Sequence, residues 1–248
     1  MAKQRLDVAL VERGLAETRA AAQRLVMAGL VFSRAKRLDK PGQAIAADTE
    51  LEVRGQPHPY VSRGGLKLEK ALDHFAIPVA GRIALDVGAS TGGFTDCLLQ
   101  RGAAKVYAVD VGTNQLAWKL RSDPRVVSME KTNIRDVMLA QIPEPIDLIV
   151  CDASFIGLRT ALPAALALAN SGAHLVALIK PQFEVGKGRV GKGGIVREPE
   201  LHKEVVETIS AWLGAQPRWT ILGVIDSPIT GADGNREFLI TGLRSAGG

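Results

Sequence analysis

The feature that most constrains the fold is a regular alternation, after about residue 80, of short apolar segments with segments of helical length. The apolar segments are residues 82–88, 105–110, 125–129, 145–152, 173–180, 219–224 and 237–242. Helices are indicated between several of them, for example at 94–101 and 200–213. Strands separated by helix-length connections form mainly parallel sheets with helices on both faces. We therefore predict an α/β fold with a doubly wound, mostly parallel sheet.

The N-terminal part of the chain has a different character. Up to Gln56 it carries ten basic and seven acidic residues, a net charge of +3 out of +5 for the whole chain. Two short helices are indicated, one from Leu6 to a stop at Gly14 and one from an N-cap at Thr18 to Met27. A Pro-His-Pro sequence then interrupts the pattern. We predict a small α+β domain at 1–56, a linker at 57–62 and the sheet domain at 63–248.

Composition excludes several classes of protein. The two cysteines, Cys97 and Cys151, are too few for a disulfide framework or a zinc cluster, and both are expected to be buried free thiols. We expect no metal site. The N-terminus lacks the apolar core of a signal peptide, and the most apolar stretch, 161–179, is interrupted by Pro163 and by polar residues at 170–172. The sequence thus predicts a cytoplasmic protein that does not bind a membrane.

A glycine-rich loop, residues 86–94 (Asp-Val-Gly-Ala-Ser-Thr-Gly-Gly-Phe), joins the first strand of the sheet to a helix. Its glycines let a ligand approach the backbone, and the N-terminus of the helix favours a carboxylate. The spacing is not that of a dinucleotide-binding loop. Asp110, at the end of the next strand, can accept hydrogen bonds from both hydroxyls of a ribose. Together these features favour a nucleoside cofactor.

One further acid, Asp136, could accept a hydrogen bond from an adenine amino group, although an ordinary loop carboxylate is an almost equal alternative. The predicted cofactor contacts are Asp86, Gly88, Ser90, Gly92, Gly93, Phe94, Asp110, Asp136 and Asp152.

Four ionisable residues stand where chemistry could use them. Asp152 and Lys180 end the fourth and fifth strands, Glu237 opens the last strand, and Lys67 lies just before the first strand of the sheet. A lysine at the end of a buried strand is uncommon, because an ammonium group resists desolvation. Its neutral amine could take a proton from a hydroxyl group. A surface salt bridge is the alternative; we favour function for Lys180 and Asp152, and both interpretations stay open for Lys67 and Glu237.

Five segments carry a family resemblance that extends over essentially the whole chain. They are Tyr60–Lys67, Asp86–Phe94, Cys151–Phe155, Ile179–Glu184 and Gly234–Phe238. The sequence resembles the TlyA family, which is called hemolysins but understood as ribosomal RNA 2′-O-methyltransferases of the Rossmann-like, FtsJ-like fold. Its N-terminal part resembles the alpha-L RNA-binding motif of ribosomal and pseudouridine-synthase proteins. The resemblance implies S-adenosylmethionine as cofactor, and cytidines of ribosomal RNA, free or in ribosomal subunits, as substrate.

The resemblance also maps a Lys-Asp-Lys-Glu tetrad onto Lys67, Asp152, Lys180 and Glu237. It implies that Lys180 is the base and that the other three position and tune it. Contacts to RNA phosphates are expected from basic residues, although a solvated surface charge is the alternative for each. These residues are Arg5, Arg19, Arg34, Lys36, Arg37 and Arg63. The basic, glycine-rich segment 186–194 is predicted to be a mobile loop, facing RNA or merely on the surface.

Three other functions are less consistent with the sequence. Enzymes that methylate exocyclic base amines carry an Asp/Asn-Pro-Pro-aromatic loop where this chain has Asp152-Ala-Ser-Phe155. Both prolines are missing, and two lysines have little purpose when the nucleophile is an amine. A membrane-active hemolysin lacks support, because no span and no strongly amphipathic basic helix is evident. A protein that only binds RNA is disfavoured by the intact tetrad.

Overall fold

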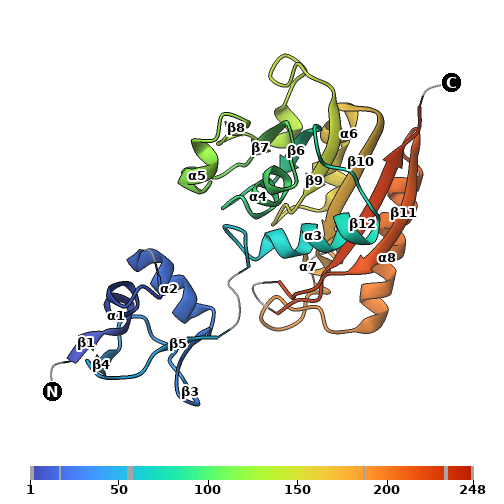
Figure 1. The fold of residues 1–248 in the computed structure, drawn as a ribbon. Coiled ribbons are helices and arrows are strands. Elements are labelled where there is room, and N and C mark those ends of the chain that lie inside the picture. Colours follow the sequence, from blue (N-terminus) through green and yellow to red (C-terminus); the bar gives the residue numbers. More distant parts are fainter. Residues whose placement is uncertain (1–2, 17, 55–57, 187, 232–233, 247–248) are drawn as a thin grey trace. The chain divides into compact units, whose positions relative to one another are not determined.

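The computed structural model describes residues 3–16, 18–54, 58–186, 188–231 and 234–246. The chain divides into two units, residues 1–59 and 60–248 (Figure 1), and each is described by itself. Part of the expected linker (Pro57), Lys187 of the glycine-rich segment and the middle of the expected turn at 231–234 lie outside the described residues.

The larger unit is built on one seven-stranded sheet in the order β11-β12-β10-β9-β6-β7-β8. The strands are β6 (Ile83–Val87), β7 (Lys105–Val109), β8 (Val126–Met129), β9 (Ile146–Cys151), β10 (Ala169–Ile179), β11 (Trp219–Asp226) and β12 (Phe238–Arg244). Every neighbouring pair is parallel except the two that involve β12. The predicted doubly wound, mostly parallel sheet is confirmed.

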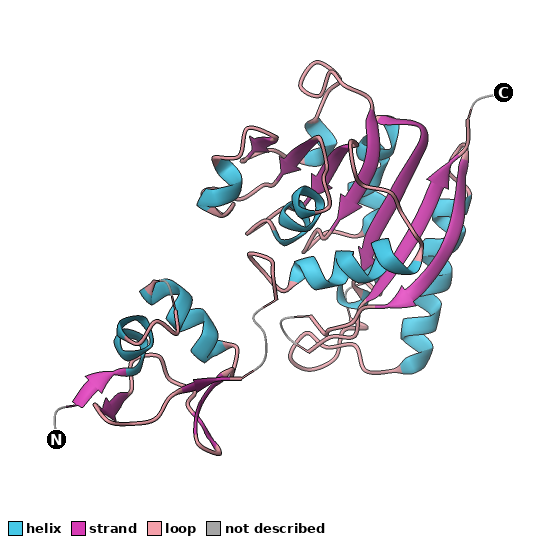
Figure 2. Cartoon of the chain, viewed as in Figure 1, coloured by secondary structure: helices cyan, strands magenta, loops and turns pink. Residues whose placement is uncertain are grey.

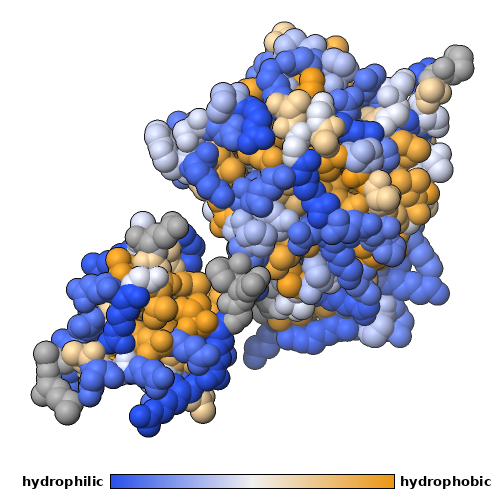
Figure 3. Space-filling view, in the orientation of Figure 1, coloured by the Kyte–Doolittle hydropathy of each residue, from blue (hydrophilic) through white to orange (hydrophobic). Residues whose placement is uncertain are grey.

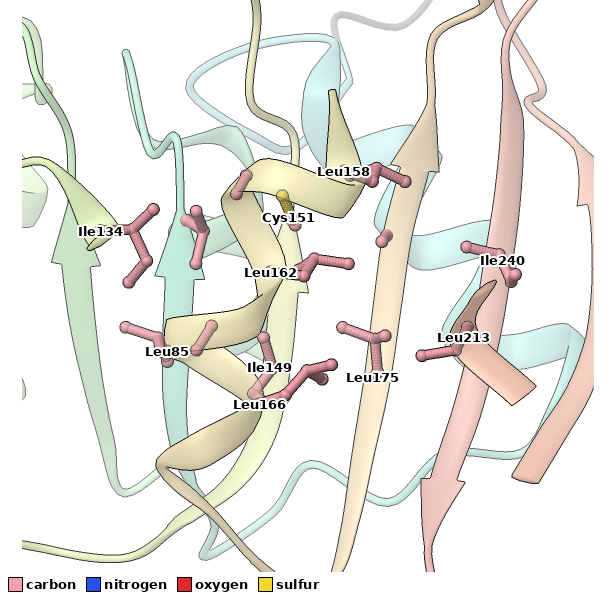
Figure 4. Close-up of a cluster of buried hydrophobic side chains, with 14 of the residues drawn as sticks. Leu85, Ile134, Ile149, Cys151, Leu158, Leu162, Leu166, Leu175, Leu213 and Ile240 are labelled. Carbon is pink, nitrogen blue, oxygen red and sulfur yellow. The ribbon is translucent and has the colours of Figure 1, made fainter. Parts of the chain in front are cut away.

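Helices cover both faces of this sheet (Figure 2). They are α3 (Gly64–His74), α4 (Gly93–Gln100), α5 (Trp118–Arg121), α6 (Leu158–Ala167), α7 (Pro181–Glu184) and α8 (Pro199–Gly214), with a 3-10 turn η1 (Ile134–Asp136). Alternate strand residues serve opposite faces, as the period of two requires. Ile149 and Cys151 pack in the cluster with α6 and α8 (Figure 4), whereas Leu148 and Val150 pack in the cluster with α3 and α4.

Helix α3 was not predicted from the sequence. It begins with Gly64 and Gly65, and glycine is a poor helix former. The helix is sustained instead by packing, since Leu68, Ala71 and Leu72 are buried in the core cluster they share with α4. Tertiary burial here outweighs local propensity.

The position of the last strand differs from the expectation that residues 237–242 close the sheet. β12 lies between β10 and β11 and is antiparallel to both, so that β11 is the edge strand. The described residues of the connection between β11 and β12 form no helix, and a parallel return would need a long crossover. Phe238 pairs with Ile179, which brings the beginning of β12 to the carboxyl end of β10.

The smaller unit contains two helices and short strands. They are β1 (Lys3–Arg5), α1 (Leu6–Glu12), α2 (Arg19–Met27), β2 (Val31–Ser33), β3 (Lys36–Arg37), β4 (Ala44–Ala46) and β5 (Glu52–Val53). The predicted N-cap is confirmed, because Oγ1 of Thr18 accepts a hydrogen bond of 3.1 Å from the backbone N–H of Ala21. Leu6, Leu10 and Val26 are fully or almost fully buried in a separate core. This unit is therefore the small α+β fold that the sequence predicted.

Candidate active site

The site lies where the winding of the sheet reverses. From β6 the chain runs outward through β7 and β8 and then returns to β9, on the other side of β6. The loops after β6 and β9 therefore diverge and leave a crevice. Gly88 follows β6 with a φ of +81°, and a Cβ atom on it would lie 2.8 Å from Cα of Ala153, in the loop after β9. Only glycine lets these two loops approach so closely.

The larger of two adjoining cavities has a volume of about 560 Å³. Of the predicted cofactor residues, Gly88, Ser90, Asp110 and Asp152 line it. The carboxylate of Asp110 accepts hydrogen bonds from the backbone N–H groups of Ser90 (2.8 Å) and Gly112 (2.7 Å). These bonds fix the acid at the cavity wall and leave lone pairs for a ligand. The size suits a small-molecule ligand such as a nucleoside.

The other predicted cofactor residues lie elsewhere. Gly92 faces α5, since a Cβ atom on it would lie 2.2 Å from Cδ1 of Leu120. Gly93 and Phe94 line the smaller cavity. Asp136 is exposed and does not line either cavity. Its near neighbours Asn133 and Ile134 line the larger cavity instead, because the 3-10 turn η1 begins at Ile134 and carries Asp136 away.

Asp86 is completely buried at the end of β6. The hydroxyl of Thr95 donates a hydrogen bond of 2.6 Å to its Oδ2, while its Oδ1 has no partner among the described residues. Burial, with a smaller contribution from the charge of Asp152, raises the pKa of Asp86 to about 7. A buried carboxylate oxygen without a partner is costly unless a ligand or water satisfies it.

The smaller cavity, about 290 Å³, shares Gly88, Ser90, Asp152 and Ser154 with the larger one. Lys180 lines it at the carboxyl end of β10. The amine of Lys180 lies 2.7 Å from Oδ1 of Asp152 and donates hydrogen bonds to Oγ of Ser154 (2.8 Å) and to the carbonyl of Asp152 (3.2 Å). The Lys180 side chain is only 9% exposed. Three contacts thus hold the amine at the wall shared by the two cavities.

The other two tetrad residues form a second ion pair. Nζ of Lys67, on α3, donates a hydrogen bond of 2.6 Å to Oε2 of Glu237, which directly precedes β12. Their side chains are 10% and 3% exposed, respectively. Lys67 lines the smaller cavity, and Glu237 is connected to it through Lys67. Four residues far apart in the sequence are therefore gathered as Lys180–Asp152 and Lys67–Glu237.

Phe155, the last residue of the Cys151–Phe155 segment, was not among the site residues predicted from the sequence. Its side chain lies at the edge of the larger cavity and is 92% exposed, with a left-handed φ of +64°. Its ring centroid lies 5.3 Å from that of Phe183. A large exposed aromatic ring beside a cavity is suited to stacking on a planar group. The signal available in the sequence was an aromatic residue three positions after Asp152.

The predicted RNA contacts fall on both units. Arg5 and Arg19 share the buried carboxylate of Asp7. The other three of the N-terminal unit, Arg34, Lys36 and Arg37, are all exposed. Arg63, in the larger unit, is exposed and lines the smaller cavity.

Comparison with known proteins identifies the family of the chain. The FtsJ-like methyltransferase model matches residues 60–244, which is most of the chain. The chain belongs to the FtsJ-like methyltransferase family. An S4 domain model matches residues 4–50, within the small N-terminal unit.

Relatives of this FtsJ-like protein match over nearly its full length. It is 54% identical to YqxC of Bacillus subtilis over 96% of this chain and 85% of that protein. It is 48% identical to the 16S/23S rRNA (cytidine-2′-O)-methyltransferase TlyA of Mycobacterium tuberculosis, over 95% of this chain and 88% of the relative. A solved structure from Streptococcus thermophilus, 48% identical, superposes with a TM-score of 0.77 and covers 99% of this chain and 90% of that one.

A further relative, Hemolysin A of Brachyspira hyodysenteriae, is 42% identical over 95% of this chain and 98% of its own length. Among the residues described for this FtsJ-like protein, no helix has the length and apolar character needed to cross a membrane. In Figure 3, hydrophilic side chains interrupt the apolar surface of each unit.

Proposed function

We propose that the protein is an S-adenosylmethionine-dependent methyltransferase that modifies a ribose 2′-hydroxyl of ribosomal RNA, with cytidine as the target nucleoside. The observation that carries this proposal is the presence of two ion pairs, Lys180–Asp152 and Lys67–Glu237, at a cavity that adjoins the nucleoside-sized one. The name of the Mycobacterium tuberculosis relative supports the choice of ribose and of cytidine.

The residues of the larger cavity fit S-adenosylmethionine. Asp110 can accept hydrogen bonds from the ribose hydroxyls, and Asn133 and Ile134 lie where they can contact a planar base. The glycine loop and the beginning of α4 suit the carboxylate of the cofactor. Asp86 lines neither cavity, so its unpartnered Oδ1 would contact the cofactor's ammonium group through a water molecule. Bound S-adenosylmethionine would supply an electrophilic methyl group.

The roles of the tetrad follow from its contacts. Lys180 is placed to accept the proton of the 2′-hydroxyl, whose oxygen would take the methyl group from bound S-adenosylmethionine and leave S-adenosylhomocysteine. Asp152 and Ser154 hold the amine in place for that transfer. Lys67, itself oriented by Glu237, supplies positive charge near the oxygen that becomes negative. Two lysines thus divide the work, with one moving the proton and the other stabilising the developing charge.

Phe155 and Arg63 are candidates to hold the target nucleotide. The exposed ring of Phe155 offers a stacking surface for a base that has left its helix. Arg63, exposed at the smaller cavity, can pair with a neighbouring phosphate. Base methylation is disfavoured by the residues Ala153 and Ser154, which replace the two prolines of amine methyltransferases.

We infer a division of labour between the domains, which we place at 1–56 and 63–248 with a linker at 57–62. The S4-like domain supplies affinity for ribosomal RNA or ribosomal subunits, and the larger domain supplies the chemistry. Since ribosomal RNA is the substrate, we place the protein in the cytoplasm.

The position of the methyl group tests the proposal. Purified protein is incubated with S-adenosylmethionine carrying a labelled methyl group and with unmodified bacterial ribosomal subunits. The RNA is then hydrolysed in alkali. A 2′-O-methyl group blocks cleavage at its own nucleotide, so the label is expected in an alkali-resistant dinucleotide that contains cytidine. Label recovered in mononucleotides would indicate base methylation and overturn the proposal.

A further inference from the structure

The N-terminal unit contains a fully buried acid to which the proposed chemistry gives no role. Asp7 has no exposed surface and lies in the first turn of α1. Its backbone N–H donates a hydrogen bond of 3.0 Å to the carbonyl of Pro41, which fixes the residue. Carboxylates are rarely buried in this way unless they are paired. The buried carboxylate of Asp7 is therefore expected to have charged partners.

Asp7 binds side chains from both sides of it in the sequence. Arg5 donates from Nε to Oδ1 (3.0 Å) and from Nη2 to Oδ2 (2.9 Å). Oδ2 also accepts hydrogen bonds from Nε of Arg19 (2.9 Å) and Nε2 of Gln23 (2.8 Å), both on α2. Since α1 and α2 pack together (Figure 1), the carboxylate joins the beginning of the chain to the second helix.

The two arginines remain accessible although their partner does not. Their side chains are 48% and 56% exposed for Arg5 and Arg19, against 0% for Asp7. A guanidinium group has five N–H donors. Within the described part of the chain, the side-chain hydrogen bonds of Arg5 use Nε and Nη2 and that of Arg19 uses Nε, so Nη1 of Arg5 and both terminal nitrogens of Arg19 remain available. The hydrogen bonds from Arg5 keep the pKa of Asp7 well below its usual range, so the anion is present at neutral pH.

We propose that Asp7 is a positioning residue for RNA binding, which holds the guanidinium groups of Arg5 and Arg19 side by side for adjacent phosphates. The inference rests on the proposed RNA-binding function of this unit. An arginine free in solvent loses conformational freedom when it binds a phosphate, and two neighbouring arginines repel each other. The buried carboxylate reduces both costs before RNA arrives. A negative charge therefore favours the binding of a polyanion.

The inference is tested by whether Asp7→Asn weakens or strengthens the binding of RNA. Asp7→Asn, made in the full chain, removes a negative charge, so long-range electrostatics alone predicts unchanged or tighter binding of RNA. Positioning predicts the opposite, about tenfold weaker binding, because two ordered side chains are released. The measurement is the affinity for a fluorescein-labelled RNA hairpin at several salt concentrations. The matched control is Asp39→Asn, which removes the exposed partner of Arg37 and should leave affinity unchanged or tighter.

A double-mutant cycle separates positioning from a general effect on the fold. In a chain that already carries Arg5→Gln and Arg19→Gln, Asp7→Asn should cause no further loss of affinity. Circular dichroism and thermal unfolding show whether the Asp7 variant folds. Should it not fold, Arg5→Lys decides, because lysine keeps the charge but cannot make the two-nitrogen contact with Asp7. Several-fold weaker binding by Arg5→Lys is expected.

Two results would overturn the inference. One is wild-type or tighter hairpin binding by a folded Asp7→Asn variant. The other, where that variant does not fold, is wild-type binding by Arg5→Lys. Failure of the wild-type chain to bind the hairpin would instead remove the proposed RNA-binding role of the unit, and this inference with it. The wild-type measurement therefore distinguishes the two failures.

Discussion

The amine of Lys67 donates a hydrogen bond of 2.6 Å to the carboxylate of Glu237, 170 positions later in the chain. The pair is almost fully buried, and Lys67 lines the same smaller cavity as Lys180 and Asp152. Burying two charges is costly, and their attraction often does no more than balance that cost. A pair that contributes little to stability yet lies at a cavity is a candidate for a functional role.

Single and double variants of the Lys67–Glu237 pair should distinguish its effect on stability from its effect on activity. Lys67→Ala leaves the Glu237 carboxylate buried without a partner and should lower the free energy of unfolding by about 3–5 kcal/mol. The double variant Lys67→Met/Glu237→Leu should recover much of that stability in urea unfolding but stay inactive in methyl transfer. An active double variant would show that the pair has only a structural role.

Lys180→Ala should lower the rate of methyl transfer by roughly 100-fold or more, the usual loss when a general base is removed. The affinity for S-adenosylmethionine, measured by calorimetry, should change little, because Lys180 does not line the larger cavity. Lys203→Ala, on the exposed face of α8, is the matched control and should be as active as the wild type. A wild-type rate from Lys180→Ala would exclude it as the base.

Gly88→Ala should destabilise the protein and abolish cofactor binding. The left-handed φ of +81° costs an alanine about 1–2 kcal/mol, and its Cβ would collide with the backbone of Ala153. Thermal unfolding with and without S-adenosylhomocysteine measures both effects. Gly214→Ala, at the end of α8, has room for a Cβ and should be neutral or slightly stabilising. If the two variants had the same unfolding temperature and the same response to S-adenosylhomocysteine, the role assigned to Gly88 would be contradicted.

Asp86 predicts an unusual dependence of stability on pH. Its pKa is about 7 in the folded chain against 3.8 for an ordinary aspartate, so the unfolded state loses the proton first as pH rises. Its contribution to stability therefore falls between about pH 4 and pH 7, by up to about 4 kcal/mol, and is constant above that range. Asp86→Asn should remove this contribution. The stability of the variant relative to the wild type should therefore be higher at pH 8 than at pH 4.5. If the free energies of unfolding of the two proteins, measured in urea, changed in the same way with pH, the raised pKa assigned to Asp86 would be contradicted.

A chain that begins at Tyr60 should bind S-adenosylmethionine with wild-type affinity, because the described residues that line both cavities belong to the larger unit. Its affinity for ribosomal RNA should fall at least tenfold, with a weaker dependence on salt, because the basic S4-like domain is gone. Filter binding at several salt concentrations measures this. Normal methylation of ribosomal RNA by the shortened chain would contradict the proposed division of labour.

Much of the fold could be predicted from local patterns. The apolar strands and the N-cap at Thr18 depend on residues that are close in the sequence, and the structure confirms them. The glycine loop and Asp110 follow from the same logic, because the carboxyl ends of parallel strands meet at one edge of the sheet. The buried free thiols of Cys97 and Cys151 are confirmed as well.

Other features could not be predicted because they depend on contacts between distant segments. The sequence alone does not distinguish Asp136 from Asn133 as a neighbour of the cavity, since the difference is made by a single 3-10 turn. It also gave no sign that α3 is a helix, because the two glycines at its beginning oppose one. Burial against the sheet decides that segment.

The sequence by itself determined which residues are available for chemistry and that Asp152 and Lys180 lie at the ends of two successive strands. Only the tertiary structure decided how the four residues pair. β12 runs antiparallel to β10, so its first residues, rather than its last, reach the edge where Lys180 lies. The direction of that strand is set by a short connection and by the pairing of Phe238 with Ile179, and no local pattern within residues 237–242 encodes either.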